Sequence, residues 1–299
     1  MKFTDGYWRV KENHNIFNAT EIRDVQLLED RILVYAACRK VMSAGQTFNE
    51  PLITVEYSSP MENVIKVRAW HHKGRQERGP VFEIEPSAPL LQISRMEERS
   101  EFKSGSLRAV IPNKGDWDVQ FYFGDKYLTG TGYKSTAYIT NDKKEPYMRE
   151  QLHLDVGTMV YGLGERFTPF CKNGQTVDMW NDDGGTCSEV AYKNVPFFIT
   201  NKGYGVLVNH PEKVSFEVAT EVVSRVQFSV PGEYVEYYLF GGDSMAEVLQ
   251  LYTMLLGKPA LPPAWSFGLW ISTSAQPEQS EKILRANVEE MRKRDLPFS

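Results

Sequence analysis

A succession of short β-patterned segments over roughly the first 240 residues constrains the fold of this chain most. The segments are rich in β-branched and aromatic residues and include RILVYAACR (31–39), LITVEYSS (52–59) and NVIKVRAW (63–70). Gly-Asp at 124–125 and Asn-Lys-Gly at 201–203 separate neighbouring segments in the manner of β-hairpin turns. Regularly spaced short strands with turn signals are typical of two packed antiparallel sheets. The sequence therefore predicts a mainly β fold, with an antiparallel β-sandwich over residues 1–242.

The pattern changes after Gly242, where a helical period replaces the alternating one. Ser244 and Glu247 have the spacing of a capping box, and Gly257 followed by Pro259 ends the segment. The apolar residues between these signals recur on one helical face: Met245, Val248, Leu249, Tyr252, Leu255 and Leu256. We expect a helix here that links the sandwich to the segment that follows.

The last segment has the alternation of an α/β domain. AWSFGLWIST (264–273) is apolar almost throughout, which suits a strand buried on both faces. Residues 277–295 predict a helix, with acidic residues early and basic residues late, and LPFS (296–299) resembles the start of another strand. Strand, helix and strand in this order open an α/β barrel or a doubly wound sheet. Because a barrel needs about 250 residues, we expect the chain to be a fragment of a longer protein.

Charge and cysteine content argue against several classes of function. The 39 acidic and 34 basic residues give a net charge of −5 without a basic cluster, so we expect no nucleic-acid partner. Cys38, Cys171 and Cys187 lack the spacing of a metal site or a disulfide framework. No apolar run approaches the roughly 18 residues that cross a bilayer, and the first residues lack the apolar run of a signal peptide. The sequence predicts no metal, no membrane partner and a cytoplasmic location.

A glycine-rich stretch, YGLGERFTPFCKNGQTVDMWNDDGG (161–185), interrupts the β pattern. Gly162 and Gly164 begin like a dinucleotide-binding motif, but Phe167 stands where the third glycine belongs, and no P-loop lysine follows. We interpret these glycines as meeting backbone angles at the end of a strand rather than as holding a phosphate.

The five histidines are scattered along the sequence. His71 and His72 fall in a polar segment, and His210 precedes a proline. No local Ser-His-Asp or Cys-His motif accompanies them. We interpret them as solvated or turn residues.

The segment WNDDGGT (180–186) is the strongest candidate for binding chemistry. It lacks the spacing of an EF-hand, although an irregular calcium loop fits its oxygen ligands. The simplest interpretation is a plain Asx-rich turn, which the two glycines permit. A sugar site also fits, because a carboxylate accepts hydrogen bonds from vicinal hydroxyls and an adjacent indole stacks on a sugar face. The residues alone leave these three interpretations open.

Four motifs together resemble the amino-terminal part of glycoside hydrolase family 31, and most closely its bacterial α-xylosidases. They are VYGLGERF (160–167), NGQTVDMWNDDGGT (173–186), AYKNVPFFITNKGYGVLVNHP (191–211) and GKPALPPAWSFGLWISTS (257–274). The resemblance implies a galactose-mutarotase-like β-sandwich over 1–242, followed over 243–299 by a linker helix and the first βα unit of a catalytic (β/α)8 barrel, of which only this start is present.

The resemblance also implies the activity. Members of the family are retaining α-glycosidases that hydrolyse terminal α-linked sugars by double displacement, without a metal or organic cofactor. The implied partner is an oligosaccharide or a small α-glycoside, and the full-length protein is compatible with a homo-oligomer. A non-catalytic β-sandwich module that binds carbohydrate is the alternative, and a purely structural sandwich is a third reading.

Site residues carry over from the family only where the motifs match. The two catalytic aspartates belong to later barrel strands, and no residue of 1–299 matches them, so the chain alone is expected to be inactive. Asp183 stands at the place of the family's substrate-contacting aspartate. Ala275 stands where α-xylosidase-like members tend to carry an aromatic residue that crowds the sugar's hydroxymethyl group. The small side chain leaves room for α-glucosides, so xylose or glucose preference stays open.

Overall fold

The computed structural model describes residues 1–74, 79–80, 83–183, 187–270 and 280–298. The chain divides into two compact units, Met1–Gly257 and Lys258–Ser299, which are described separately below. The predicted boundary at 242/243 is not tested by this division and stays a prediction.

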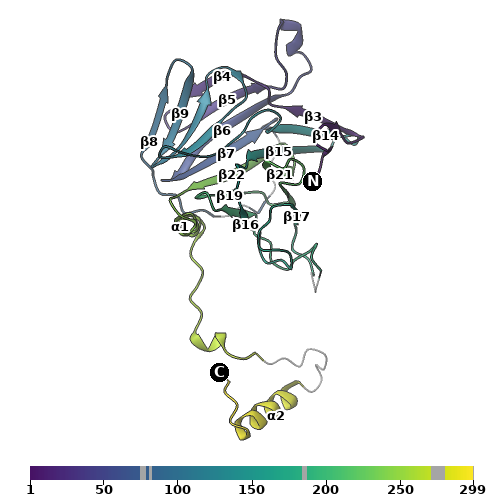
Figure 1. Cartoon of the computed structure of the whole chain (residues 1–299), viewed down its shortest axis with the longest axis vertical. Helices are drawn as coiled ribbons and strands as arrows, with labels where there is room; N and C mark the ends of the chain where they lie inside the picture. Colours follow the sequence, from purple (N-terminus) through teal and green to yellow (C-terminus); the bar gives the residue numbers. More distant parts are fainter. Residues whose placement is uncertain (75–78, 81–82, 184–186, 271–279, 299) are drawn as a thin grey trace. The chain divides into compact units, whose positions relative to one another are not determined.

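Three antiparallel sheets build the first unit (Figure 1). The nine-stranded sheet has the order β11 (Gly115–Asp116), β4 (Glu21–Leu27), β5 (Ile32–Ala37), β6 (Leu52–Met61), β7 (Val64–Trp70), β22 (Tyr234–Gly241), β19 (Tyr204–Val208), β18 (Phe197–Thr200) and β16 (Val160–Gly162). The six-stranded sheet has the order β17 (Gln175–Met179), β20 (Val214–Val218), β21 (Arg225–Pro231), β15 (Pro146–His153), β14 (Ala137–Asn141) and β3 (His14–Asn18).

The five-stranded sheet has the order β13 (Lys126–Gly130), β12 (Gln120–Phe123), β10 (Leu107–Pro112), β9 (Arg99–Ser104) and β8 (Leu91–Arg95). A small ribbon pairs β1 (Thr4–Asp5) with β2 (Arg9–Val10), and a short 3-10 helix spans Ala44–Thr47. Along β10, buried and half-buried residues alternate strictly, as the period of a strand requires. The mainly β, antiparallel prediction is confirmed.

Both predicted hairpin turns are present. Gly124 and Asp125 join β12 to β13, whose closing pair is Phe123 and Lys126. Asn201–Gly203 joins β18 to β19. Gly203 has a φ of 83°, and a Cβ atom there would lie 2.3 Å from the carbonyl oxygen of Gly242, so this turn requires glycine.

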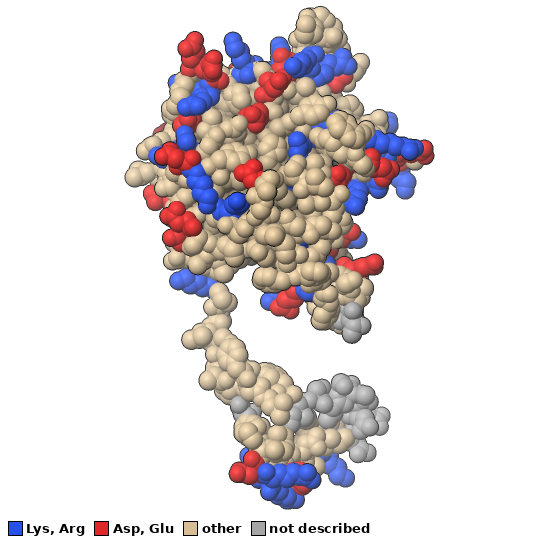
Figure 2. All heavy atoms as spheres, in the orientation of Figure 1, with Lys and Arg blue, Asp and Glu red and all other residues tan. Residues whose placement is uncertain are grey.

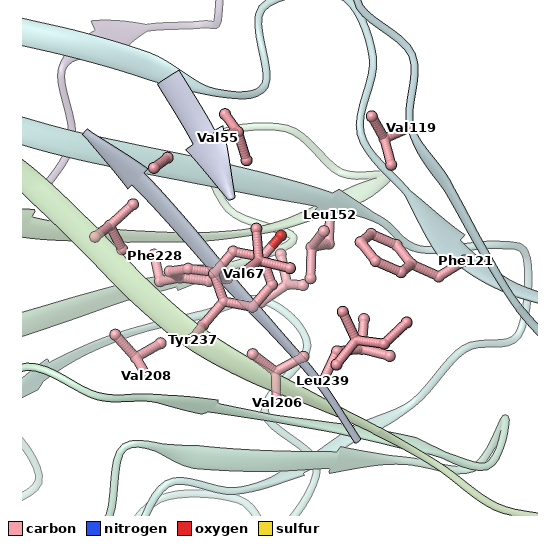
Figure 3. Packing of buried hydrophobic residues seen from close by; sticks show 14 of the residues in the cluster. Val55, Val67, Val119, Phe121, Leu152, Val206, Val208, Phe228, Tyr237 and Leu239 are labelled. Carbon is pink, nitrogen blue, oxygen red and sulfur yellow. The ribbon is translucent and has the colours of Figure 1, made fainter. Parts of the chain in front are cut away.

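The largest hydrophobic cluster lies between the sheets (Figure 3). Phe228 of β21 meets Tyr237 of β22 with ring centroids 5.1 Å apart, which joins the six-stranded sheet to the nine-stranded sheet. Tyr57 of β6 and Phe121 of β12 make the corresponding contact with the five-stranded sheet at 6.4 Å. Burial of each such side chain contributes roughly 1.5–3 kcal/mol. These contacts fix how the sheets stack.

Helix α1 (Met245–Leu256) packs on β18, β19 and β22. The Ser244 hydroxyl accepts a hydrogen bond from the Glu247 N–H, as the capping box predicts. Tyr252 stacks on Phe197 with ring centroids 4.2 Å apart. The apolar face is buried only in part, because Met245 and Leu249 lie on the side of the helix away from the sheet and are exposed.

In the second unit, the prediction of a strand over 264–273 is wrong for residues 264–270, the part of this range that the structure describes. Ala264–Phe267 forms a 3-10 helix, and 268–270 have no regular structure. A strand buried in a parallel sheet depends on neighbours to which it hydrogen-bonds, and the described part of Lys258–Ser299 contains no other strand. The second predicted helix is confirmed as α2 (Ser280–Lys293), with an Arg285–Glu281 ion pair at 2.9 Å.

The surface carries both signs of charge. Figure 2 shows lysine and arginine side chains interspersed with aspartate and glutamate on the visible face of the sandwich. Within the described residues, no helix is long and apolar enough to cross a membrane.

Candidate active-site loop

The glycine-rich stretch and the residues that follow it form two segments, 163–174 and 180–196, on either side of β17. Figure 1 shows them projecting from the sandwich beside β16 and β17. We call the described residues of these two segments the loop site. The first segment follows β16, the edge strand of the nine-stranded sheet, and the second leads back to its neighbour, β18. Between them lies β17, the edge strand of the six-stranded sheet, so both of these sheets anchor the loop site.

Gly162 and Gly164 allow the two segments to touch. Their φ angles are 105° and 83°, a region that favours glycine. A Cβ atom on Gly164 would lie 2.4 Å from the Lys193 carbonyl oxygen and 2.9 Å from the Asn194 Cα atom. The structure agrees with the interpretation that these glycines serve the backbone.

Asn181 and Asn194 close the second segment on itself. The Asn181 Oδ1 atom accepts hydrogen bonds from the Asn194 backbone N–H and side-chain amide, both at 3.0 Å. The Asp182 N–H donates to the Ala191 carbonyl at 3.1 Å. We call Asp182 and Asp183 the acidic tip. Its backbone is held by the hydrogen bonds between Asn181 and Asn194 and between Asp182 and Ala191.

Asp183 is exposed at this tip. Its N–H donates to Asp182 Oδ1 at 2.8 Å, and its carboxylate accepts a hydrogen bond from the Tyr192 hydroxyl. The carboxylate is thus oriented by Tyr192 while it remains accessible to solvent. The arrangement suits an acceptor of hydrogen bonds from a polyhydroxyl ligand.

Arg166 joins the two segments to β17. Its guanidinium donates to the carbonyl oxygens of Asp178 at 2.7 Å and Glu189 at 3.2 Å, and also to Asn194 Oδ1. Burial lowers the pKa of the guanidinium from its usual value. No sequence motif singled out Arg166, because its partners, two backbone carbonyls and the Asn194 side chain, come together only in the folded loop.

A pocket of about 480 Å³ lies between the segments. Its lining includes the aromatic residues Phe167, Phe170 and Tyr192, all three largely exposed. Below them the buried Lys172 ammonium donates to Thr168 Oγ1 at 2.9 Å and to the Pro169 carbonyl at 3.0 Å. Tyr192 both lines the pocket and contacts Asp183, which links the acidic tip to the aromatic lining.

The remaining predictions have mixed outcomes. Trp180, expected to present its ring to a ligand, is half exposed and has the Lys213 ammonium 5.9 Å from its ring centre. Ala275 lies outside the described residues. The histidines were interpreted as solvated or turn residues; His210 lies in the connection after β19, but its side chain is buried, so the solvated alternative is wrong for it. No cluster of three metal-ligating side chains occurs in the described part of the chain.

Comparison with known proteins places this geometry in context. Residues 54–217 match the family described as the glycosyl hydrolase 31 N-terminal galactose mutarotase-like domain. The whole chain is 42% identical to 39% of alpha-xylosidase XylQ of Lactiplantibacillus pentosus, and 37% identical to 41% of an alpha-xylosidase of Emericella nidulans. The chain thus spans about two-fifths of the length of these relatives.

Solved structures agree with the fold. The cycloalternan-forming enzyme of Listeria monocytogenes, in complex with a pentasaccharide substrate, superposes on 96% of this chain and 26% of its own with a TM-score of 0.78 at 18% identity. A GH31 alpha-xylosidase from a soil metagenome, complexed with xylose, superposes on 93% of this chain and 40% of its own with a TM-score of 0.71 at 18% identity.

Proposed function

The chain belongs to glycosyl hydrolase family 31, and from this premise we propose that it is the amino-terminal part of a retaining α-glycosidase. The proposed enzyme is an α-xylosidase or α-glucosidase that hydrolyses terminal α-linked sugars of an oligosaccharide or small α-glycoside. The observation that carries the proposal is the exposed Asp183 carboxylate, held by Tyr192, which itself lines an aromatic pocket.

The chemical step is assigned to carboxyl groups outside 1–299. Retention requires one carboxylate that attacks the anomeric carbon and one carboxyl group that protonates the leaving oxygen, about 5–5.5 Å apart. The covalent glycosyl-enzyme then reacts with water, which the second group deprotonates. No residue of this chain matches the family's catalytic motifs, so this chain contributes binding and positioning.

Asp183 is the proposed substrate-binding residue. An ionised carboxylate accepts hydrogen bonds from sugar hydroxyls, and each such bond to a charged group contributes about 1.5–3 kcal/mol. Tyr192 acts through Asp183 by orienting the carboxylate, and Arg166 holds together the segments that carry both residues. Bonds made before the substrate arrives reduce the entropy lost when it binds.

Ala275 is the proposed determinant of sugar preference. A small residue at this place accommodates the hydroxymethyl group that distinguishes glucose from xylose, so both α-glucosides and α-xylosides remain candidate substrates. The free thiols Cys38, Cys171 and Cys187 agree with the proposed reducing, cytoplasmic location.

The test compares the 299-residue chain with the protein encoded by the complete reading frame. We expect the complete protein to hydrolyse p-nitrophenyl α-xyloside or α-glucoside with retention, and the shorter chain to be inactive. Hydrolysis by the shorter chain would contradict the assignment of the carboxyl groups. Saturable sugar binding by the complete protein without any hydrolysis would favour the carbohydrate-binding module instead.

A further inference from the structure

Three aromatic side chains and one lysine gather where the β1–β2 ribbon meets the connection from β13 to β14. Tyr7 and Trp8 belong to the turn between β1 and β2, and Tyr133 and Lys134 belong to the connection. Trp8 is 76% exposed and Tyr133 is 64% exposed. We call these four residues the aromatic patch. It shares no residue with the loop site.

The backbone holds the aromatic patch in a fixed arrangement. Tyr7 and Lys134 have φ angles of 69° and 62°, a region that residues with a side chain rarely adopt. The buried Arg149 donates a hydrogen bond to the Lys134 carbonyl at 2.7 Å. Arg225 donates to the Tyr133 carbonyl at 2.8 Å. Backbone conformations of this kind persist where surrounding contacts fix them, and they cluster at functional sites.

The Lys134 ammonium lies among the three rings of the patch. Its nitrogen is 5.3 Å from the ring centre of Tyr7, 5.4 Å from that of Trp8 and 5.3 Å from that of Tyr133. The Tyr7 and Trp8 rings also meet edge to face, with centroids 5.2 Å apart. Such contacts fix the rings relative to the ammonium. Trp8 and Tyr133 are therefore held in place while most of their surface faces solvent.

The patch has two cations that lack a carboxylate partner. Lys134 and Arg225 are half-buried, and neither forms an ion pair within the described part of the chain. The Arg225 guanidinium donates instead to a backbone carbonyl and to an amide oxygen. On the ribbon itself, Asp5 lies opposite Arg9, so these two charges offset each other.

The charges beneath the patch do not cancel these two cations. The Glu221 carboxylate interacts with the buried Arg149. The buried Glu150 carboxyl interacts with both Arg149 and Arg225, but burial raises its pKa to about 7, so it is only partly ionised at neutral pH. The positive charge of Lys134 and Arg225 therefore favours a ligand that carries a carboxylate.

From these observations we propose that the aromatic patch binds a saccharide unit that bears a carboxylate, a uronic acid. The exposed rings of Trp8 and Tyr133 contact the apolar face of the sugar. The Lys134 ammonium donates charge-assisted hydrogen bonds to the carboxylate. The saccharide class rests on the proposed function, whereas the acidic group follows from the charges of the patch.

The test is a titration of the 299-residue chain with methyl α-glucuronoside and with methyl α-glucoside, which differ in the carboxylate. Calorimetry measures the affinity, and the NMR signal of the Trp8 indole N–H, identified by its loss in Trp8→Phe, reports the place of binding. We expect the glucuronoside to shift this signal and to bind about fivefold more tightly than the glucoside, the scale of one exposed ion pair. The difference should shrink as the salt concentration rises.

Three variants separate the contributions. Lys134→Gln keeps a long polar side chain but removes the charge, and should abolish the preference for the glucuronoside without changing the affinity for the glucoside. Trp8→Ala should weaken the binding of both ligands about tenfold, the scale of a lost aromatic contact. Phe48→Ala removes an aromatic side chain outside the patch that is 74% exposed, so it is the matched control and should change neither affinity.

Two results would overturn the proposal without requiring any variant to fold. One is the absence of saturable glucuronoside binding, or saturable binding that leaves the Trp8 signal in place. The other is a glutamate-rich peptide that shifts the Trp8 signal at lower concentration than the glucuronoside, which would assign the patch to a protein partner. Hydrolysis by the complete protein is assayed separately, so failure of this proposal and failure of the proposed function can be told apart.

Discussion

The Tyr192 hydroxyl donates a hydrogen bond to the Asp183 carboxylate across nine positions of sequence. The preceding residue of each partner is also paired, because the Asp182 N–H donates to the Ala191 carbonyl. Together the two bonds hold the acidic tip against the segment that lines the aromatic pocket. The side chain that we propose to bind substrate is therefore positioned by the loop site itself rather than by the sheets.

Replacement of Asp183 by alanine should lower kcat/KM of the complete protein at least about tenfold, because a hydrogen bond to a charged acceptor contributes about 1.5–3 kcal/mol. Steady-state kinetics on p-nitrophenyl α-glycosides measure the effect. Asp142→Ala, at an exposed turn between β14 and β15, is the control and should not change the kinetics. An unchanged kcat/KM for Asp183→Ala would refute the proposed contact.

Replacement of Tyr192 by phenylalanine should have a smaller effect, a roughly threefold to tenfold loss of kcat/KM, because the carboxylate remains but loses an orienting partner. The thermal midpoint should stay constant, since both side chains are exposed. Tyr35→Phe removes a hydroxyl that donates to Gln26 and serves as the control. A loss equal to that of Asp183→Ala would instead indicate that Tyr192 itself contacts the sugar.

Gly164→Ala and Gly174→Ala form a matched pair. Both glycines have a positive φ, 83° and 85°, but a Cβ atom would meet the Lys193 carbonyl only at position 164, and at 174 it would meet nothing within 4 Å. The shared backbone strain costs about 1–2 kcal/mol, and the clash should add about 1–3 kcal/mol at Gly164 alone. Urea unfolding of both variants measures the difference. Equal losses in the free energy of unfolding would mean that the loop backbone shifts to relieve the clash at position 164 at no energetic cost.

Glu150 makes the stability of the sandwich depend on pH. Burial raises the pKa of this carboxyl from 4.5 to about 7, although Thr136 and the Gln151 N–H donate hydrogen bonds to it. Between these two values the folded state holds a proton that the unfolded state has released. The free energy of unfolding should therefore fall as pH rises from 4.5 to 7, by about 3 kcal/mol.

Glu150→Gln should remove this dependence of the free energy of unfolding on pH. Relative to the unsubstituted chain, it should therefore stabilise the protein more at pH 8 than at pH 5. Urea unfolding at the two pH values provides the measurement. Glu62→Gln, at an exposed position between β6 and β7, should leave the slope as it is. A slope that survives in Glu150→Gln would assign the pH dependence to another group.

Several features followed from local sequence because their causes are local. The turns at 124–125 and 201–203 depend on glycine and its neighbours, and the capping box of α1 depends on Ser244 and Glu247, three positions apart. The alternation of β10 reports directly which side chains face the core. Such features need only a few adjacent residues, so a pattern of residues predicts them.

The strand predicted at 264–273 failed because its cause is not local. An apolar run of this kind suits a buried strand only where other strands supply hydrogen bonds, and residues 264–270 have none within the described part of their unit. The burial of His210 was missed for the same reason, since Tyr234, whose ring packs against it, is distant in sequence.

The sequence by itself determined the antiparallel β class, the turn positions, the helices and the place of Asp183 as a candidate. Tertiary structure alone decided that Arg166 joins the loop segments, that Tyr192 orients Asp183, and that the His210 side chain is buried. The physical reason is that periodicity and turn chemistry act between neighbours, whereas the partners of a buried or charged side chain come from segments that only folding brings into contact.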